Sequence, residues 1–239
     1  MPRLPEFRHE VVDASASRVF ELVENKTNGC VPNLFKTPAR EAKMEFSEPL
    51  MGIIPNGLVI LRSNLPAFKP FLNEAGELRF GQLLSDGKYR VATITGRSFG
   101  PGIDAVLKEH AGKPAISIVP STDHFATRLL KLATQKEYHA VIGYATELRY
   151  VTRESKLNIA DFVFLPVVEE RTPIPMYVGC SKAEPGRKAI AAINRALSDA
   201  NVRRELRNAY RAWLDEETAE RFDKLNKAES AKRSNIRAK

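Results

Sequence analysis

Long apolar runs are missing from this 239-residue sequence, and none approaches the roughly 20 residues that a membrane-spanning helix needs. Cysteine and histidine are also scarce. With two cysteines and four histidines, the sequence fits neither a disulfide-rich scaffold nor a zinc-ribbon pattern. Residues 1–8 carry charge but no apolar stretch, so they do not have the form of a secretory signal.

The composition is that of a globular protein with many short elements. Hydrophobic residues make up 43% of the chain and charged residues 28%, while 15 prolines and 13 glycines favour tight turns. The net charge of +8 is compatible with nucleic-acid binding. The basic residues are spread along the chain, however, with no stripe of basic and aromatic residues. We therefore favour a solvated basic surface that attracts small anions and expect no nucleic-acid partner.

The common enzyme motifs are absent as well. The sequence contains no G-x-G-x-x-G, Walker P-loop, H-E-x-x-H or G-x-S-x-G pattern, so it predicts no cofactor, metal site or catalytic residue. Its histidines fall on different expected elements. Cys30 and Cys180 could pair if their strands belonged to one sheet, but we expect two buried free thiols.

Strands and helices alternate through the middle of the chain, which is typical of βαβ units and predicts an α/β fold. Before this block, the pattern indicates a strand at 9–14, a helix at 18–23 and a short helix that begins after Thr37. From residue 184 onward the chain reads as helical. The block itself is expected to contain strands at 57–61, 89–95, 115–119, 138–144 and 162–168 and helices at 101–109 and 121–134, with a last strand at 176–180.

One candidate anion-binding segment begins at Thr37. Threonine is a good N-cap, and Pro38 suits the first helical position. Arg40 then lies in the first helical turn, where its guanidinium and the exposed N–H groups favour an anion. The alternative is an exposed arginine paired with Glu41 or Glu45.

Further candidates follow the strands of the alternating block. In open α/β sheets, ligands bind outside the carboxyl ends of the strands, just before the next helix. Positions of this kind are held by Gly96, Arg97, Ser98, Ser121, Thr122 and Tyr144.

Several segments in the right order resemble family 3 solute-binding proteins, which are type II periplasmic binding proteins. Residues 36–49 match a T-x-x-R…F-S-x-P pattern, and residues 57–62 follow it as expected. The later matches are residues 89–98, 138–144, 176–182, 189–197 and 211–214. As a whole, the resemblance covers about residues 7–222.

The resemblance implies two α/β lobes joined by two crossover strands, near residues 53–58 and 168–175, with a ligand in the cleft between the lobes. Lobe one would comprise residues 1–55 and 172–225, lobe two residues 56–171, and residues 226–239 a basic flexible tail. It also implies that Arg40 grips a ligand carboxylate, while Gly96, Arg97 and Ser98 contribute N–H and hydroxyl groups.

The sequence departs from the family pattern in two places. Tyr144 stands where amino-acid binders carry an aspartate for the ligand ammonium, and Arg97 adds positive charge, so we expect an anionic ligand without an ammonium group. The chain also opens near the family's second strand. We therefore expect the full-length product to be exported to the periplasm, and the first lobe to have an unpaired strand edge.

The expected function is an extracytoplasmic solute-binding protein, monomeric and without enzymatic activity, that delivers its solute to a membrane permease of an ABC transporter. One alternative is a sensing module that acts on a membrane receptor. Another is a dehydratase-type enzyme on the same fold, for which Glu48 or Glu147 would serve as the general acid.

Overall fold

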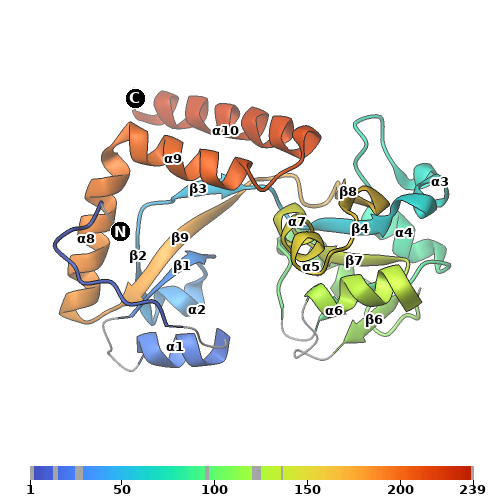
Figure 1. Cartoon of the computed structure of the whole chain (residues 1–239), viewed down its shortest axis with the longest axis horizontal. Coiled ribbons are helices and arrows are strands. Elements are labelled where there is room, and N and C mark those ends of the chain that lie inside the picture. The colour runs from blue at the N-terminus through green and yellow to red at the C-terminus, as the bar shows by residue number, and fades with distance from the viewer. Residues whose placement is uncertain are drawn as a thin grey trace. The chain divides into compact units, whose positions relative to one another are not determined.

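The computed structural model describes residues 3–12, 16–24, 29–94, 97–119, 125–135 and 137–237. The chain divides into two compact units (Figure 1). Unit 1 contains Met1–Ile53, Ile174–Ala212 and Phe222–Lys239, and unit 2 contains Ile54–Pro173 and Trp213–Arg221. The sequence-based division did not anticipate that last segment of unit 2. Within the described ranges, no helix is long and apolar enough to cross a membrane.

Strand β9 organises the sheet of unit 1. This strand (Ile174–Ser181) pairs antiparallel with β1 (Cys30–Leu34) along one edge. Along its other edge it pairs antiparallel with β2 (Met44–Phe46) and with β3 (Met51–Ile53). A single eight-residue strand therefore joins three segments from the first quarter of the chain.

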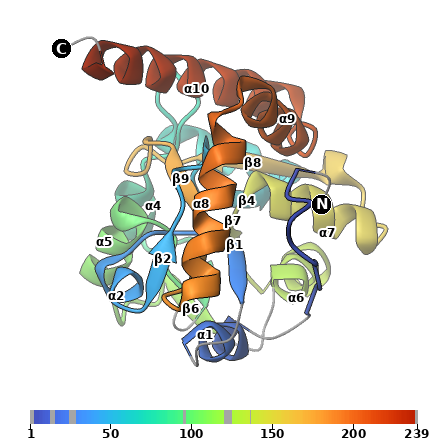
Figure 2. The ribbon, with the colours of Figure 1, turned by 90° about the vertical axis from the view of Figure 1, so that its left-hand side faces the viewer.

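The helices of unit 1 come from both ends of the chain. They are α1 (Ala16–Glu24), α2 (Pro38–Glu41), α8 (Glu184–Ser198), α9 (Ala200–Arg211) and α10 (Glu216–Arg237), the last from Phe222 onward. Figure 2 shows α8 lying across β9 and β2, and these elements are in contact. The helical reading from residue 184 is confirmed, because Ile190 and Leu197 are buried on one face of α8.

Two expectations at the chain ends differ from the structure. No strand forms over residues 9–12, and residues 13–15 lie outside the described ranges. Val11 and Val12 are exposed, so no apolar face is buried there to favour pairing. The segment expected as a flexible tail from residue 226 is instead helical, because α10 continues to Arg237.

Unit 2 contains a five-stranded sheet in the order β6–β5–β7–β4–β8. The parallel strands β5 (Val91–Ile94), β6 (Ile116–Val119) and β7 (Ala140–Gly143) come from the alternating block and confirm its reading as βαβ units. Strand β4 (Gly57–Leu61) runs antiparallel to β7 and to β8 (Phe162–Pro166). Successive residues of β4 enter different cores on the two faces of the sheet, because Leu58 and Ile60 join one cluster and Val59 the other.

Short helices cover both faces of this sheet. Helix α5 (Pro101–Glu109) has the bounds that the sequence predicts. Helix α6 (Phe125–Leu130) continues into a π-helical turn over Lys131–Gln135, and the predicted caps Ser121 and Thr122 lie outside the described ranges. The remaining helical segments of unit 2 are α3 (Leu65–Phe68), α4 (Phe80–Asp86), α7 (Ala145–Glu154) and the 3₁₀ turns at Arg62–Asn64, Lys69–Phe71 and Ile159–Asp161.

The two cysteines form a disulfide, which corrects the expectation of free thiols. Cys30 of β1 stands directly opposite Cys180 of β9 in the antiparallel register, with Cα atoms 4.1 Å apart. The strand pairing that the sequence left open therefore brings the two sulfur atoms together. The bond links segments 150 residues apart in the chain.

Candidate functional site

Thr37 sets the start of α2, as the sequence predicts. Its backbone is extended, and its Oγ1 accepts a hydrogen bond from the backbone N–H of Arg40 at 3.4 Å. Pro38 occupies the first helical position, where its missing N–H costs nothing. This cap places Arg40 at the end of a short, fixed turn.

The Arg40 guanidinium is oriented by neutral groups. Its Nη1 donates to the carbonyl oxygen of Phe35 at 2.8 Å, and its guanidinium carbon lies 5.1 Å from the centre of the Phe20 ring. Within the described ranges, no carboxylate lies within ion-pair distance of Arg40, and Glu41 pairs instead with Lys36 at 2.8 Å. Pairing with Glu41 or Glu45 is therefore wrong, and Arg40 supplies an uncompensated positive charge.

Arg97, in unit 2, is held by a carboxylate. Its two terminal nitrogens each lie 3.0 Å from an oxygen of Glu147, in a bidentate pair. The Glu147 carboxylate also accepts the backbone N–H of Tyr144 at 2.9 Å, which caps α7. The Arg97 charge is thus largely compensated, contrary to the expectation that it adds net positive charge.

Tyr144 directly follows β7 and stands beside Asn56, the residue that precedes β4, because Gly143 pairs with Gly57. Burial raises the pKa of the Tyr144 hydroxyl to about 12, against the opposing effects of a hydrogen bond from Asn56 and the charge of Arg97. The hydroxyl is therefore neutral near pH 7 and able to donate. The Arg97 guanidinium lies 5.7 Å from the centre of the tyrosine ring.

Asn56 carries an unmatched acceptor beside this tyrosine. Its side chain is almost completely buried, and its Nδ2 donates to the carbonyl oxygen of Phe99 at 2.9 Å. Its Oδ1 has no hydrogen-bond partner among the described residues. Buried acceptors are usually satisfied, so this oxygen marks a position for a donor group.

The first turn of α5 is occupied by the protein's own carboxylates. Ser98 Oγ donates to Asp104 at 2.5 Å, and the Phe99 N–H donates to the same carboxylate at 2.9 Å. The Gly102 N–H donates to Glu170 at 2.7 Å. The Ser98 hydroxyl is therefore engaged by a carboxylate of α5, and Gly96 lies outside the described ranges.

Sequence reasoning missed Asn56 and Glu170 at this edge of the sheet. Asn56 follows Pro55 and directly precedes a buried strand, a position that could have drawn attention to it. Nothing in the local sequence connects Glu170 with Gly102, because 68 residues separate them. Glu147 was weighed only as a general acid, yet its carboxylate is engaged by Arg97 and by a helix N–H.

Comparisons with known proteins identify the fold. No protein-family model and no curated protein matches the chain. Among solved structures, a Bacillus subtilis protein described as a probable amino-acid ABC transporter extracellular-binding protein has a TM-score of 0.60 and 17% identity, over 87% of this chain and 82% of the other. The chain has the type II periplasmic-binding-protein fold.

Two further structures with this fold illustrate the similarity. An ancestral cationic amino acid solute-binding protein has a TM-score of 0.59 and 17% identity, over 86% of this chain and 78% of its own. A structure from work on glutathione and cystine import in Streptococcus mutans also has a TM-score of 0.59, with 12% identity, over 84% of this chain and 77% of its own. In this chain, Arg40 lies in the first turn of α2 and Tyr144 is the N-cap residue of α7.

Proposed function

We propose that this chain is an extracytoplasmic solute-binding protein that captures a small anionic solute for an ABC importer. The observation that carries the proposal is Arg40, a guanidinium oriented by a carbonyl and a ring and left without a carboxylate partner in the described part of the chain. A side chain held in this way is suited to a ligand carboxylate. The transport-associated binding proteins that share the fold support the same role.

Unit 2, taken by itself, presents neutral polar groups at its strand ends. Tyr144 is a neutral donor and Asn56 offers a buried acceptor, whereas the nearest charges, Arg97 and Glu147, satisfy each other. Among the described residues, the carboxylates whose charges act on Tyr144 are Glu147, which Arg97 binds, and Glu170, which accepts the Gly102 N–H, so neither is left for an ammonium group. A carboxylate-bearing solute with hydroxyl or amide groups therefore fits better than an α-amino acid.

The disulfide supports a place outside the cytoplasm. Disulfides persist in oxidising compartments such as the periplasm and are rare in the cytosol. A binding protein in that compartment would deliver its solute to a membrane permease.

A thermal-shift screen of the wild-type protein tests this function. Mono- and dicarboxylic acids, including succinate, glutarate and hydroxy acids, are compared with the common amino acids at equal concentration. We expect the melting temperature to rise with carboxylic acids, because a ligand that binds only the folded state stabilises it. Stabilisation by amino acids alone would contradict the anionic class, and no stabilisation by either set would contradict the binding function.

A further inference from the structure

A cavity between α9 and α10 is separate from the residues described above. Its volume is about 380 Å³, and all its lining residues belong to unit 1. The two helices are labelled in Figure 1. The lining consists of Arg207, Asn208, Arg211, Phe222, Asp223, Asn226 and Lys227.

Contacts between the two helices fix the walls of this cavity. Phe222 is almost fully buried, and its ring centre lies 5.0 Å from that of Tyr210. Between the helices, Arg211 Nε donates to Asp223 at 3.0 Å; within α10, Asn226 Nδ2 donates to the Phe222 carbonyl oxygen at 2.9 Å. The cavity is thus held by an aromatic contact and an ion pair.

The charges around the cavity do not balance. Three cations, Arg207, Arg211 and Lys227, face one carboxylate, Asp223, and that carboxylate is already engaged by Arg211. Among the described residues, neither Arg207 nor Lys227 has a carboxylate within ion-pair distance. Their positive charges, together with the Asn208 amide, leave the cavity rich in donors and poor in acceptors, which favours an anion.

The size and the chemistry of the cavity favour a phosphate ester. A volume of about 380 Å³ falls in the usual range for small-molecule pockets. It can therefore take a phosphate together with a small organic group. Arginine matches phosphate geometry through its planar fork, and lysine adds a point charge.

The sequence beyond the cavity adds positive charge. Residues 224–239 contain six lysines and arginines and one glutamate, for a net charge of +5. The backbone of α10 carries this segment onward from the cavity as far as Arg237. Clusters of basic residues attract the anionic phosphates of lipid headgroups. The cavity lining and the basic segment at residues 224–239 therefore both favour a ligand that carries a phosphate.

We propose that the cavity between α9 and α10 is a second binding site, specific for a phosphate ester, supplied either by an anionic lipid headgroup or by a soluble phosphomonoester. Arg207 and Lys227 hold the phosphate oxygens, and Asn208 donates to the ester group. This site goes beyond the proposed solute-binding function and does not depend on it.

Two binding measurements on the whole protein distinguish the sources. Calorimetric titration with sn-glycerol 3-phosphate probes the soluble ester, and sedimentation with phosphatidylglycerol vesicles, against phosphatidylcholine vesicles, probes the lipid. Saturable binding to glycerol phosphate without vesicle binding would assign a soluble ligand. Selective binding to phosphatidylglycerol vesicles would assign a lipid. Absence of both would overturn the proposal.

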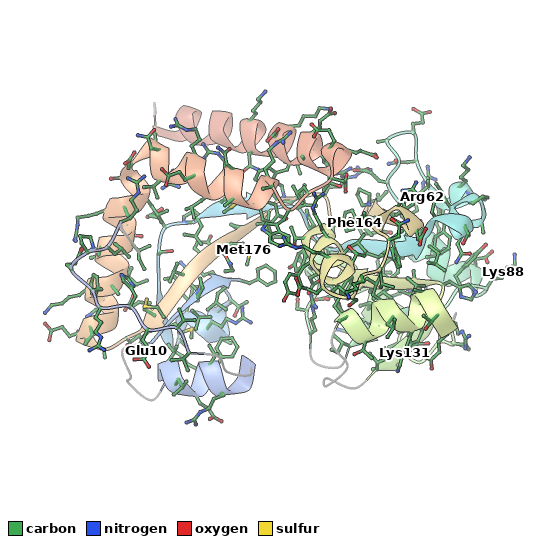
Figure 3. All side chains as sticks on the ribbon, viewed as in Figure 1. Glu10, Arg62, Lys88, Lys131, Phe164 and Met176 are labelled. Carbon is green, nitrogen blue, oxygen red and sulfur yellow. A yellow bond between two sulfur atoms is a disulfide. The ribbon has the colours of Figure 1, made fainter. Side chains whose placement is uncertain are left out.

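A double variant, Arg207→Gln with Lys227→Gln, tests whether the cavity is responsible. We expect the affinity for the bound probe to fall at least about tenfold, as two charge-assisted contacts are lost. The matched control, Lys88→Gln with Lys113→Gln, removes two exposed lysines of unit 2, and Figure 3 labels Lys88. We expect the control to bind like the wild type, and circular dichroism checks that both variants fold. Equal losses in the two variants would show general charge attraction and overturn the proposal.

Discussion

At the scale of single residues, Glu77 shows how one buried carboxylate holds distant segments of unit 2 together. It accepts from Asn73 Nδ2 at 2.9 Å, pairs with Arg171 at 2.7 Å and pairs with Arg221. Burial by itself raises the pKa of Glu77, but the hydrogen bonds from Asn73 and Arg221 and the charges of both arginines hold it below its ordinary value. The ionised form is therefore the one that the fold stabilises.

This carboxylate predicts an acid dependence of stability. Because the pKa of Glu77 is lower in the folded state, its contribution is fully present above pH 4.5, the ordinary value, and is lost as the pH falls through the folded pKa. We expect Glu77→Gln to cost on the order of 3 kcal/mol near pH 7 and less at pH 3. Urea unfolding at both pH values measures the difference. A pH-independent cost would contradict the ion-pair account.

The Asn56 amide is expected to stabilise unit 2 through its donor. In Asn56→Ala, the buried Phe99 carbonyl loses the Nδ2 hydrogen bond, so we expect a cost of about 1–3 kcal/mol in the free energy of unfolding. Denaturant unfolding measures this loss. Asn201→Ala, at an exposed position, is the control and should change stability by less than about 0.5 kcal/mol. Equal effects of the two substitutions would rule out a specific role for the Phe99 contact.

At the scale of elements, the strand pair β1–β9 carries the covalent link of unit 1. The disulfide constrains the unfolded chain by closing a loop of 150 residues, and such bonds contribute about 2–5 kcal/mol. We expect the double variant Cys30→Ser with Cys180→Ser to have a free energy of unfolding that is lower by this amount. Urea unfolding measures the difference, and the midpoint should move to a lower urea concentration. A reductant should destabilise the wild type and leave the variant unchanged. Two reactive thiols in the unfolded, unreduced wild type would show that no disulfide exists.

Elements with a strong local signal could be predicted from the sequence. Pro101 opens α5 and Thr37 caps α2 because proline and threonine act on their immediate neighbours. Elements that depend on distant partners could not. The Cys30–Cys180 pairing requires the register of two strands 150 residues apart, and Glu170 closes the start of α5 from 68 residues away.

At the scale of the whole molecule, the order of the motifs predicted two α/β units, and the chain divides between Ile53 and Ile54 and between Pro173 and Ile174. The sequence could not show that Trp213–Arg221 joins unit 2. That placement depends on contacts of single side chains, such as Arg221 with Glu77 and Trp213 with Tyr150. The sequence also could not show that Glu147 compensates the charge of Arg97, because this too depends on a contact between single side chains.

The role of Arg40 is tested most directly by calorimetric titration. The ligand is the carboxylic acid that gives the largest rise in melting temperature in the thermal-shift screen. In Arg40→Gln we expect its affinity to fall about ten- to hundredfold with the fold intact, because a charge-assisted contact to a carboxylate is lost. The control Lys188→Gln, which removes an exposed charge in the same unit, should bind like the wild type. Unchanged affinity in Arg40→Gln would contradict Arg40 as the carboxylate-binding residue.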